Sequence, residues 1–259
     1  MIPWRIILKR SQEEKALLNL IQTEFLKLRR RKFIWIMLLA SILMPLIGIF
    51  YFSASGTAEI PPMKFYKWTA FSYTLWIILP IVLGMLSTML MQDENQNDML
   101  KQLWIIPVSK MGYFFSKFAV VFFYSLCFML LAAVSSILAG VLPGTISLTA
   151  DSVTFLFLKC LEIGVLAPFA IIPVLSVAAS QKGYILPVCV TIIYTFLGFI
   201  LLMGNMYIHP LSSMIAIIVR NIQGVVIKEP VHLGKAFLCM SIWGTVSTVW
   251  ANGRLKKGK

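Results

Sequence analysis

The sequence has 259 residues, of which 59% are hydrophobic and only 13% are charged. This composition excludes a soluble globular domain, because such domains rarely exceed about half apolar residues. The net charge of +13 would raise the question of nucleic-acid binding in a soluble protein, but here the basic residues flank apolar segments and indicate contact with anionic lipid. We therefore expect an all-α integral membrane protein with the lipid bilayer, and no nucleic acid, as its partner.

Residues 1–32 form a polar and basic segment before the first apolar run. Within it, residues 13–32 place five apolar side chains on one helical stripe, with charged and amide residues on the other faces: Leu17, Leu18, Ile21, Phe25 and Leu28. A basic amphipathic helix next to a span is expected to lie along the inner membrane surface. The alternative is a general basic anchor, which would make the same surface contact.

Residues 33–251 predict a membrane domain of six helices, because a helical span needs about 20 apolar residues. The expected spans are 33–53, 69–91, 114–142, 154–180, 184–204 and 235–251. The third is longer than a bilayer requires and must tilt or bend, and the sixth is short and the least apolar. Prolines interrupt several spans, which membrane helices tolerate because neighbouring groups satisfy the freed carbonyls.

The basic residues predict that both ends of the chain lie in the cytoplasm. With six spans and the N-terminus inside, seventeen of the 23 Lys and Arg residues fall on cytoplasmic segments and six lie on or near the outer side. This asymmetry follows the preference of basic loops for the cytoplasm. An odd number of spans would instead put the basic tail, 252–259, outside.

The cytoplasmic loop 92–117 contains a short amphipathic run that is too apolar to remain in water. The run comprises Met99, Leu100, Leu103 and Trp104, and Pro107 follows it. The residues alone leave two interpretations open. Either the run dips into the lipid interface, or it fills a groove on another protein.

Lys159 and Glu162 lie within the outer part of the fourth span, where ionisable groups are costly and are functional candidates. Their i, i+3 spacing allows them to pair on one helix face, with Lys159 reaching outward to the interface. The alternative is a role in a substrate path or in contact with another subunit.

The outer segment 205–234 is apolar, but its charged residues exclude a simple span. A surface helix or a re-entrant hairpin over the outer mouth fits both properties. Its histidines, His209 and His232, lie 23 residues apart without nearby carboxylate or thiolate ligands, so no metal site is predicted. The four cysteines have no CxxC spacing and are expected to be small buried hydrophobes: Cys127, Cys160, Cys189 and Cys239.

Two segments carry a motif. In the loop, Glu94 is followed by Lys101 and Leu103, then by Pro107-Val108-Ser109-Lys110, and Ser116-Lys117 opens the next span. Near the N-terminus, Glu24 and Lys27 precede the basic run 28–32 and Trp35. With the six-span layout, these motifs resemble the type-2 ABC exporter permeases along essentially the whole chain. In chain length and in the pattern of its apolar and basic segments, the sequence is most similar to the permeases for lantibiotic or bacteriocin immunity and peptide-antibiotic resistance.

The resemblance implies that residues 1–32 are the family's elbow helix and that the loop is a coupling helix docked on a cytoplasmic ABC ATPase. The coupling residues would be Glu94, Met99, Leu100, Leu103, Trp104, Pro107 and Lys110. The family often has Gly-Thr where this chain has Asn97-Asp98, so the start of the small helix is expected to differ.

The resemblance further implies a non-catalytic subunit of the bacterial plasma membrane, which dimerises with itself or with a sister permease. ATP and magnesium would bind the partner ATPase and no cofactor would bind this chain, whose sequence has no G-x-x-x-x-G-K-[ST] phosphate loop. The expected function is ATP-driven export of an antimicrobial peptide, with Lys159 and Glu162 on a possible substrate path.

An ion-coupled secondary transporter that acts without an ATPase is the main alternative. Such a carrier needs coupling carboxylates near the midplane, often in internally repeated halves. Glu162 is the one candidate carboxylate, and residues 33–142 and 154–251 show no clear repeat. A membrane-embedded enzyme fits less well, because Glu13-Glu14 lies outside the spans without partnering histidines at membrane depth.

Overall fold

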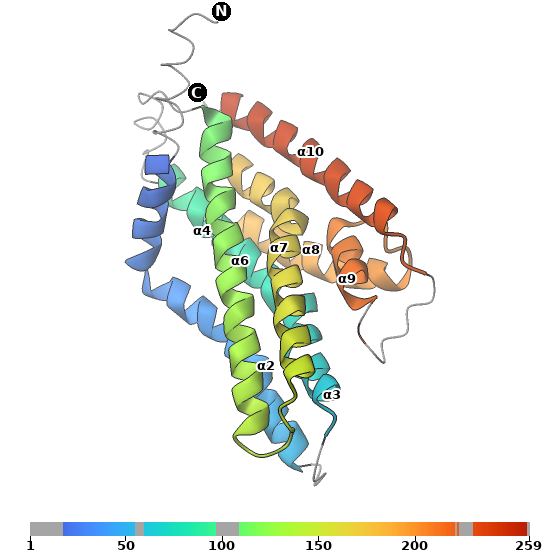
Figure 1. Cartoon of the computed structure of the whole chain (residues 1–259). Coiled ribbons are helices and arrows are strands. Elements are labelled where there is room, and N and C mark those ends of the chain that lie inside the picture. The colour runs from blue at the N-terminus through green and yellow to red at the C-terminus, as the bar shows by residue number, and fades with distance from the viewer. Residues whose placement is uncertain (1–17, 55–59, 97–108, 221, 223–229, 258–259) are drawn as a thin grey trace, which may run out of the picture.

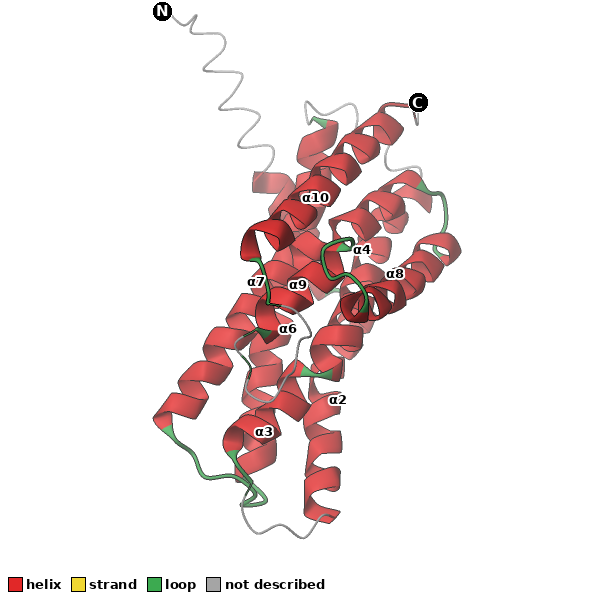
Figure 2. Cartoon of the chain, turned by 90° about the vertical axis from the view of Figure 1, so that its right-hand side faces the viewer, coloured by secondary structure: helices red, strands yellow, loops and turns green. Residues whose placement is uncertain are grey.

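The computed structural model describes residues 18–54, 60–96, 109–220, 222 and 230–257. Within these ranges the chain consists of helices and loops without a strand (Figure 2). Five helices of this part are long and apolar enough to cross a membrane. They correspond to the first five predicted spans, with shifted ends.

The chain enters the bundle through a helix over residues 18–29, which lies within the amphipathic segment predicted at 13–32. The helical pattern breaks at residues 30 and 31, and α2, Lys32–Ala54, begins after the break. Figure 1 shows the chain turning between these two helices. The 18–29 helix is therefore a separate element at one end of the bundle rather than an extension of the first span.

The second span begins at Pro62, seven residues before its predicted start, and continues to Glu94. It comprises α3, Pro62–Tyr66, two π-helical stretches over 67–71 and 74–78, and α4, Leu79–Gln96. Pro80 explains part of this irregularity, because it has no N–H to donate to the carbonyl four residues earlier. The hydroxyl of Thr74 donates to the carbonyl of Thr69 at 3.1 Å, which satisfies one carbonyl of the widened turns.

The next two spans form the long antiparallel pair in the middle of Figure 1: α6, Lys110–Val141, and α7, Ala150–Ser180. At about 1.5 Å per residue, the 32 residues of α6 extend well beyond a hydrocarbon core of about 30 Å. The two helices approach closely at Gly164, where an added Cβ would lie 3.2 Å from the Cα of Leu126. Small residues allow such close approach in membrane helices.

The remaining helices are α8, Ile185–Met203, the short α9, Pro210–Val219, and α10, Leu233–Lys257. All ten residues of α9 are buried, since it packs against α7, α8 and α10. A surface helix is therefore the wrong interpretation for this part of 205–234. Polar side chains along α10 and basic residues near both of its ends lower its hydropathy, and it is not among the five candidate spans; a sixth span stays a prediction.

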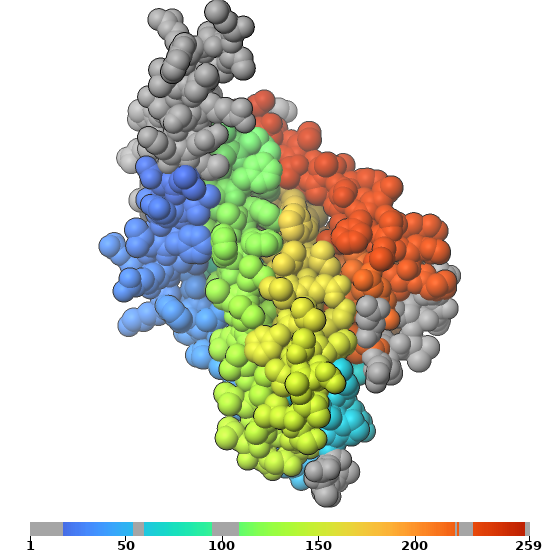
Figure 3. Space-filling view, in the orientation of Figure 1, coloured from blue at the N-terminus to red at the C-terminus, as the bar shows by residue number. Residues whose placement is uncertain are grey.

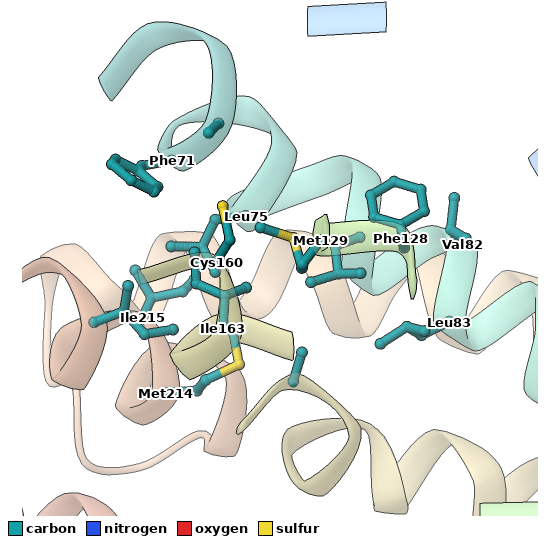
Figure 4. Packing of buried hydrophobic residues seen from close by; sticks show 14 of the residues in the cluster. Phe71, Leu75, Val82, Leu83, Phe128, Met129, Cys160, Ile163, Met214 and Ile215 are labelled. Atoms are coloured by element: carbon teal, nitrogen blue, oxygen red, sulfur yellow. The ribbon is translucent and has the colours of Figure 1, made fainter. Parts of the chain in front are cut away.

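The apolar core lies where the second span meets α6, α7 and α9. Figure 4 shows Leu75, Phe128, Cys160, Ile163 and Met214 converging there from those elements. Each of these side chains is fully buried. This core fixes the middle of the bundle and leaves the polar contacts to its ends.

Polar contacts join four elements at one end of the bundle. The Gln92 amide donates to the carbonyls of Ala178 and Gln181 at 2.9 and 2.8 Å, which ties α4 to the end of α7. Lys110 Nζ donates to the carbonyl of Leu255 at 2.7 Å, which ties the start of α6 to the end of α10. The same end carries the 18–29 helix (Figure 1).

Candidate functional site

A buried ionic cluster at this end connects the 18–29 helix with α4 and α6. We define it by four residues, Glu24, Lys27, Glu94 and Lys117. Lys117 Nζ lies 2.5 Å from Glu24 Oε2 and 2.8 Å from Glu94 Oε1. Lys27 Nζ lies 2.9 Å from Glu24 Oε1 and 2.6 Å from Glu94 Oε1. Each carboxylate therefore binds both ammonium groups, and the three elements share one network.

The cluster is charge-balanced and largely excluded from solvent. Glu24 and Lys117 are each 1% exposed and Glu94 is 3% exposed, whereas the side chain of Lys27 is 49% exposed. Buried charges of this kind are tolerated only when they are paired and hydrogen-bonded. Removal of one member would leave an uncompensated charge in the interior, so the network holds its three elements in one arrangement.

Local sequence explains how the 18–29 helix presents its two members. Leu20, Glu24 and Leu28 repeat every four residues and are buried, which defines the inward face of the helix. Lys27 follows Glu24 by three residues and lies at the edge of this face. Burial alone would lower the pKa of Lys27, but the hydrogen bonds and charges of Glu94 and Glu24 outweigh that effect and raise it above its ordinary value.

A second polar contact extends the network to the start of α8. Arg31 pairs with Asp93 at 2.9 Å, and the Tyr184 hydroxyl donates to Asp93 Oδ1 at 2.7 Å. Burial, together with the hydrogen bond and charge of Asp93, raises the pKa of Tyr184 to about 12. The hydroxyl therefore stays protonated and remains a donor at neutral pH.

The predicted apolar stripe of the 18–29 helix is only partly the face that packs inward. Leu28 is buried and Ile21 is half-buried, but Leu18 and Phe25 are exposed, and Leu17 lies outside the described residues. The sequence pattern therefore missed the inward position of Glu24. The four-residue spacing of Leu20, Glu24 and Leu28 indicates a shared helix face, but a charged residue at the middle position is normally a sign that the face is exposed.

The predicted coupling residues fall into two groups. Met99, Leu100, Leu103, Trp104 and Pro107 lie outside the described residues. Glu94 and Lys110 lie in α4 and α6 rather than in a loop, so the predicted loop 92–117 was too long at both ends. Within the same chain, Glu94 binds Lys27 and Lys117 as a member of the ionic cluster, and Lys110 donates to the carbonyl of Leu255.

Lys159 and Glu162 form the ion pair that their spacing allows, with 2.5 Å between Nζ and Oε2. Lys159 does not reach outward as predicted. It is 6% exposed and also donates to the carbonyl of Ile218 at 3.2 Å, at the C-terminal end of α9. A cation at a helix C-terminus is favourable, because unpaired carbonyls carry partial negative charge there. Participation in a substrate path stays a prediction.

Among the described residues, no group of three or more His, Cys, Asp or Glu side chains could hold a metal ion. His209 instead caps α9, since its Nδ1 accepts the N–H of Leu211 at 3.2 Å. The prediction of buried cysteines is correct for Cys160 and Cys239 and wrong for Cys127 and Cys189, which are exposed.

Comparison with known proteins identifies a family for most of the chain. Residues 20–198 match the family model described as ABC-2 family transporter protein. The matched range contains all four residues of the ionic cluster and the first five candidate spans except the end of α8. A comparison with curated proteins gave no match.

Proposed function

Since this chain belongs to the ABC-2 family of transporters, it is a multi-pass membrane permease subunit, and we propose that it exports an amphipathic antimicrobial peptide across the bacterial plasma membrane. Family membership indicates a non-catalytic subunit that pairs with an ABC ATPase. We assign the binding of ATP and magnesium to that ATPase. The peptide substrate, the dimeric arrangement with itself or a sister permease, and the sites of contact belong to the proposal.

The ionic cluster is the observation that carries the coupling part of the proposal. The segment 97–108 leaves α4 shortly after Glu94 and returns to α6 shortly before Lys117. Both of these residues bind Glu24 or its partner Lys27. A displacement of 97–108 by a partner would therefore move α4, α6 and the 18–29 helix together. ATP-driven closure of soluble subunits requires a stiff connection of this kind.

We assign the ATPase contact to 97–108, with Leu103 and Trp104 as the apolar anchors. The 18–29 helix, the α7–α8 turn and the end of α10 share one end of the bundle with the end of α4 and the start of α6, which flank this segment in the chain. Of the 16 Lys and Arg residues in the described ranges, eleven lie in these elements or directly after the 18–29 helix, which supports a cytoplasmic location for this end and for both termini. Two cytoplasmic termini require an even number of spans, which favours six spans over five.

An amphipathic substrate is supported by the apolar interior. In the described part of the chain, the buried ionisable side chains gather in the ionic cluster and around α9, and the core between them is apolar. A hydrophilic solute would need polar groups along its path. A peptide with a broad apolar surface could move along the surface of the permease that faces the bilayer or the second subunit. We assign its contacts to 53–68, 205–234 and the half-exposed Glu162 beside Lys159.

The coupling part is tested by copurification of the tagged chain from its native membrane, with mass spectrometry of the proteins that accompany it. We expect an ABC ATPase with the wild-type chain and its loss with the double variant Leu103→Ala, Trp104→Ala. A matched control, Trp35→Ala with Leu39→Ala, removes the same residue types from the exposed face of α2 and should retain the ATPase.

Absence of an ATPase from every preparation would overturn the proposal and favour an ion-coupled carrier, with Glu162 as the residue to test next. The substrate part needs a separate measurement. Cells that express the chain with its ATPase should survive higher concentrations of at least one member of a lantibiotic panel. Cells with an ATP-hydrolysis-deficient ATPase should not. Equal survival across the whole panel would reject the peptide substrate while leaving the coupling result intact.

A further inference from the structure

An apolar cleft opens between the 18–29 helix, α2 and α6, on the side of the bundle away from α7. Figure 3 shows these elements side by side, in blue and green. Its aromatic walls are Phe25, Trp35, Phe123 and Tyr124, and Cys127 also lines it. The cleft has a volume of about 290 Å³. A cavity of about 150 Å³ already holds a benzene molecule, so this cleft has room for a length of hydrocarbon chain.

One cationic group lines this otherwise apolar surface. Arg29 is exposed and forms no ion pair with any residue in the described ranges. No acidic residue lines the cleft, and the hydroxyl of Tyr124 is already bonded to the carbonyl of Ile34 at 3.1 Å. The site therefore combines a long apolar surface with one positive charge that forms no ion pair within the described ranges.

The position of the cleft along α2 gives it a direction relative to the bilayer. α2 begins at Lys32, next to the exposed basic residues, and Leu38 lines the cleft six residues further on. At about 1.5 Å per residue, this is a descent of about 9 Å from the basic run into the span. The cationic part of the cleft therefore lies before the start of the first span, and its apolar part lies within that span.

We propose that this cleft binds one anionic phospholipid, with an acyl chain between Trp35 and Phe123 and the phosphate at Arg29. The cleft has its positive charge before the span and its apolar surface within the span, which is also the order of the charged headgroup and the acyl chains in such a lipid. Anionic headgroups attract basic residues next to a span. An empty apolar cleft facing the bilayer would be filled by lipid in any case. The positive charge of Arg29 makes the site selective for an anionic headgroup.

The bound lipid would act as a wedge that supports the 18–29 helix. Phe25 and Phe123 touch edge to face at one wall, with their ring centroids 5.8 Å apart. Glu24, the preceding residue of the helix, points inward to the ionic cluster. The lipid would therefore contact the outward side of the same helix whose inward side carries the cluster. This inference does not depend on the nature of the transported substrate.

The test is native mass spectrometry of the full-length chain, released from nanodiscs that contain equal amounts of phosphatidylglycerol and phosphatidylcholine. We expect one retained phospholipid per chain, predominantly phosphatidylglycerol. Arg29→Gln should lower the ratio of retained phosphatidylglycerol to phosphatidylcholine by about fivefold, the factor that corresponds to one basic residue at an anionic surface. Arg30→Gln, an equal change of charge at an exposed neighbour outside the cleft, should leave the ratio close to that of the wild type.

A second pair of variants tests the acyl-chain part. Cys127→Trp fills the cleft and should remove the retained lipid whatever its headgroup. Cys189→Trp, at an exposed position on α8 outside the cleft, should retain it. Thermal unfolding of each variant verifies that it is folded. The proposal is overturned if no lipid is retained, if retention shows no headgroup preference, or if the members of either pair behave alike.

Discussion

Lys117 in α6 and Glu24 in the 18–29 helix bring their charged atoms to 2.5 Å although 93 residues separate them in the chain. Glu94 in α4 accepts from the same ammonium group at 2.8 Å. The 18–29 helix, α4 and α6 therefore meet through one buried network, although they are far apart in the sequence.

Lys117→Met should destabilise the protein by about 3–5 kcal/mol, because it leaves two buried carboxylates with only the half-exposed Lys27 between them. The measurement is thermal unfolding in detergent, followed by intrinsic fluorescence. Lys256→Met, which removes an exposed positive charge at the end of α10, serves as the matched control and should change stability by less than about 0.5 kcal/mol.

The double variant Lys117→Met, Glu24→Gln should be more stable than Lys117→Met alone. It removes one charge of each sign, so that Glu94 and Lys27 remain as a balanced pair. Such recovery is the sign of direct coupling between contacting residues. Additive losses in the double variant would contradict the shared network.

Gly84→Ala should destabilise the contact between α4 and α8 by about 1–3 kcal/mol through overpacking. An added Cβ would lie 2.1 Å from Cγ2 and 3.0 Å from Cβ of Thr191, whose branched side chain has little freedom to move. Adding Thr191→Ala should recover part of the loss. Gly253→Ala is the control, because no neighbouring atom lies within 4 Å of its added Cβ.

Lys159→Met should loosen α9, because the variant removes the buried cation at the helix C-terminus. Amide hydrogen exchange over 211–219 should accelerate by about tenfold or more, since hydrogen bonds to charged groups contribute about 1.5–3 kcal/mol. Glu162→Gln should have a smaller effect, because Lys159 can still donate to the Ile218 carbonyl. Unchanged exchange in Lys159→Met, or a larger effect of Glu162→Gln, would show that this capping is unimportant.

Acidification should destabilise the protein through His209. Burial lowers the pKa of this side chain to about 4 from an ordinary value of 6.5, so the unfolded chain binds a proton that the folded chain excludes. The stabilising contribution is complete above pH 6.5 and is lost as pH falls towards 4, by roughly 1–2 kcal/mol at pH 5. Protonation would also remove the Nδ1 acceptor that caps α9.

The measurement is the difference in melting temperature between pH 7.5 and pH 5 for the wild type and for His209→Asn. Asparagine retains a side-chain acceptor at a helix N-cap but does not titrate in this range. The variant should therefore lose less stability on acidification than the wild type. An equal loss in both proteins would assign the pH dependence to other groups.

Individual motif residues were recognisable from the sequence, but their contacts were not. Glu24, Lys27, Glu94 and Lys117 each belong to the motifs that resemble type-2 permeases. The motif nevertheless predicts an ATPase contact for Glu94, and it indicates for Lys117 only the start of a span. Side-chain distances between segments 23 and 93 residues apart depend on how α4, α6 and the 18–29 helix pack, which local spacing does not encode.

The sequence by itself determined the approximate positions of the first five apolar spans, because the length of an apolar run is a local property set by the thickness of the bilayer. It also determined the excess of basic residues on one set of connecting segments. Only the tertiary structure decided that α9 is buried, that Lys159 caps it, and that Glu24 points inward. These outcomes depend on which apolar and charged surfaces find a partner elsewhere in the chain, and the free energy of burying a charge is favourable only where that partner is present.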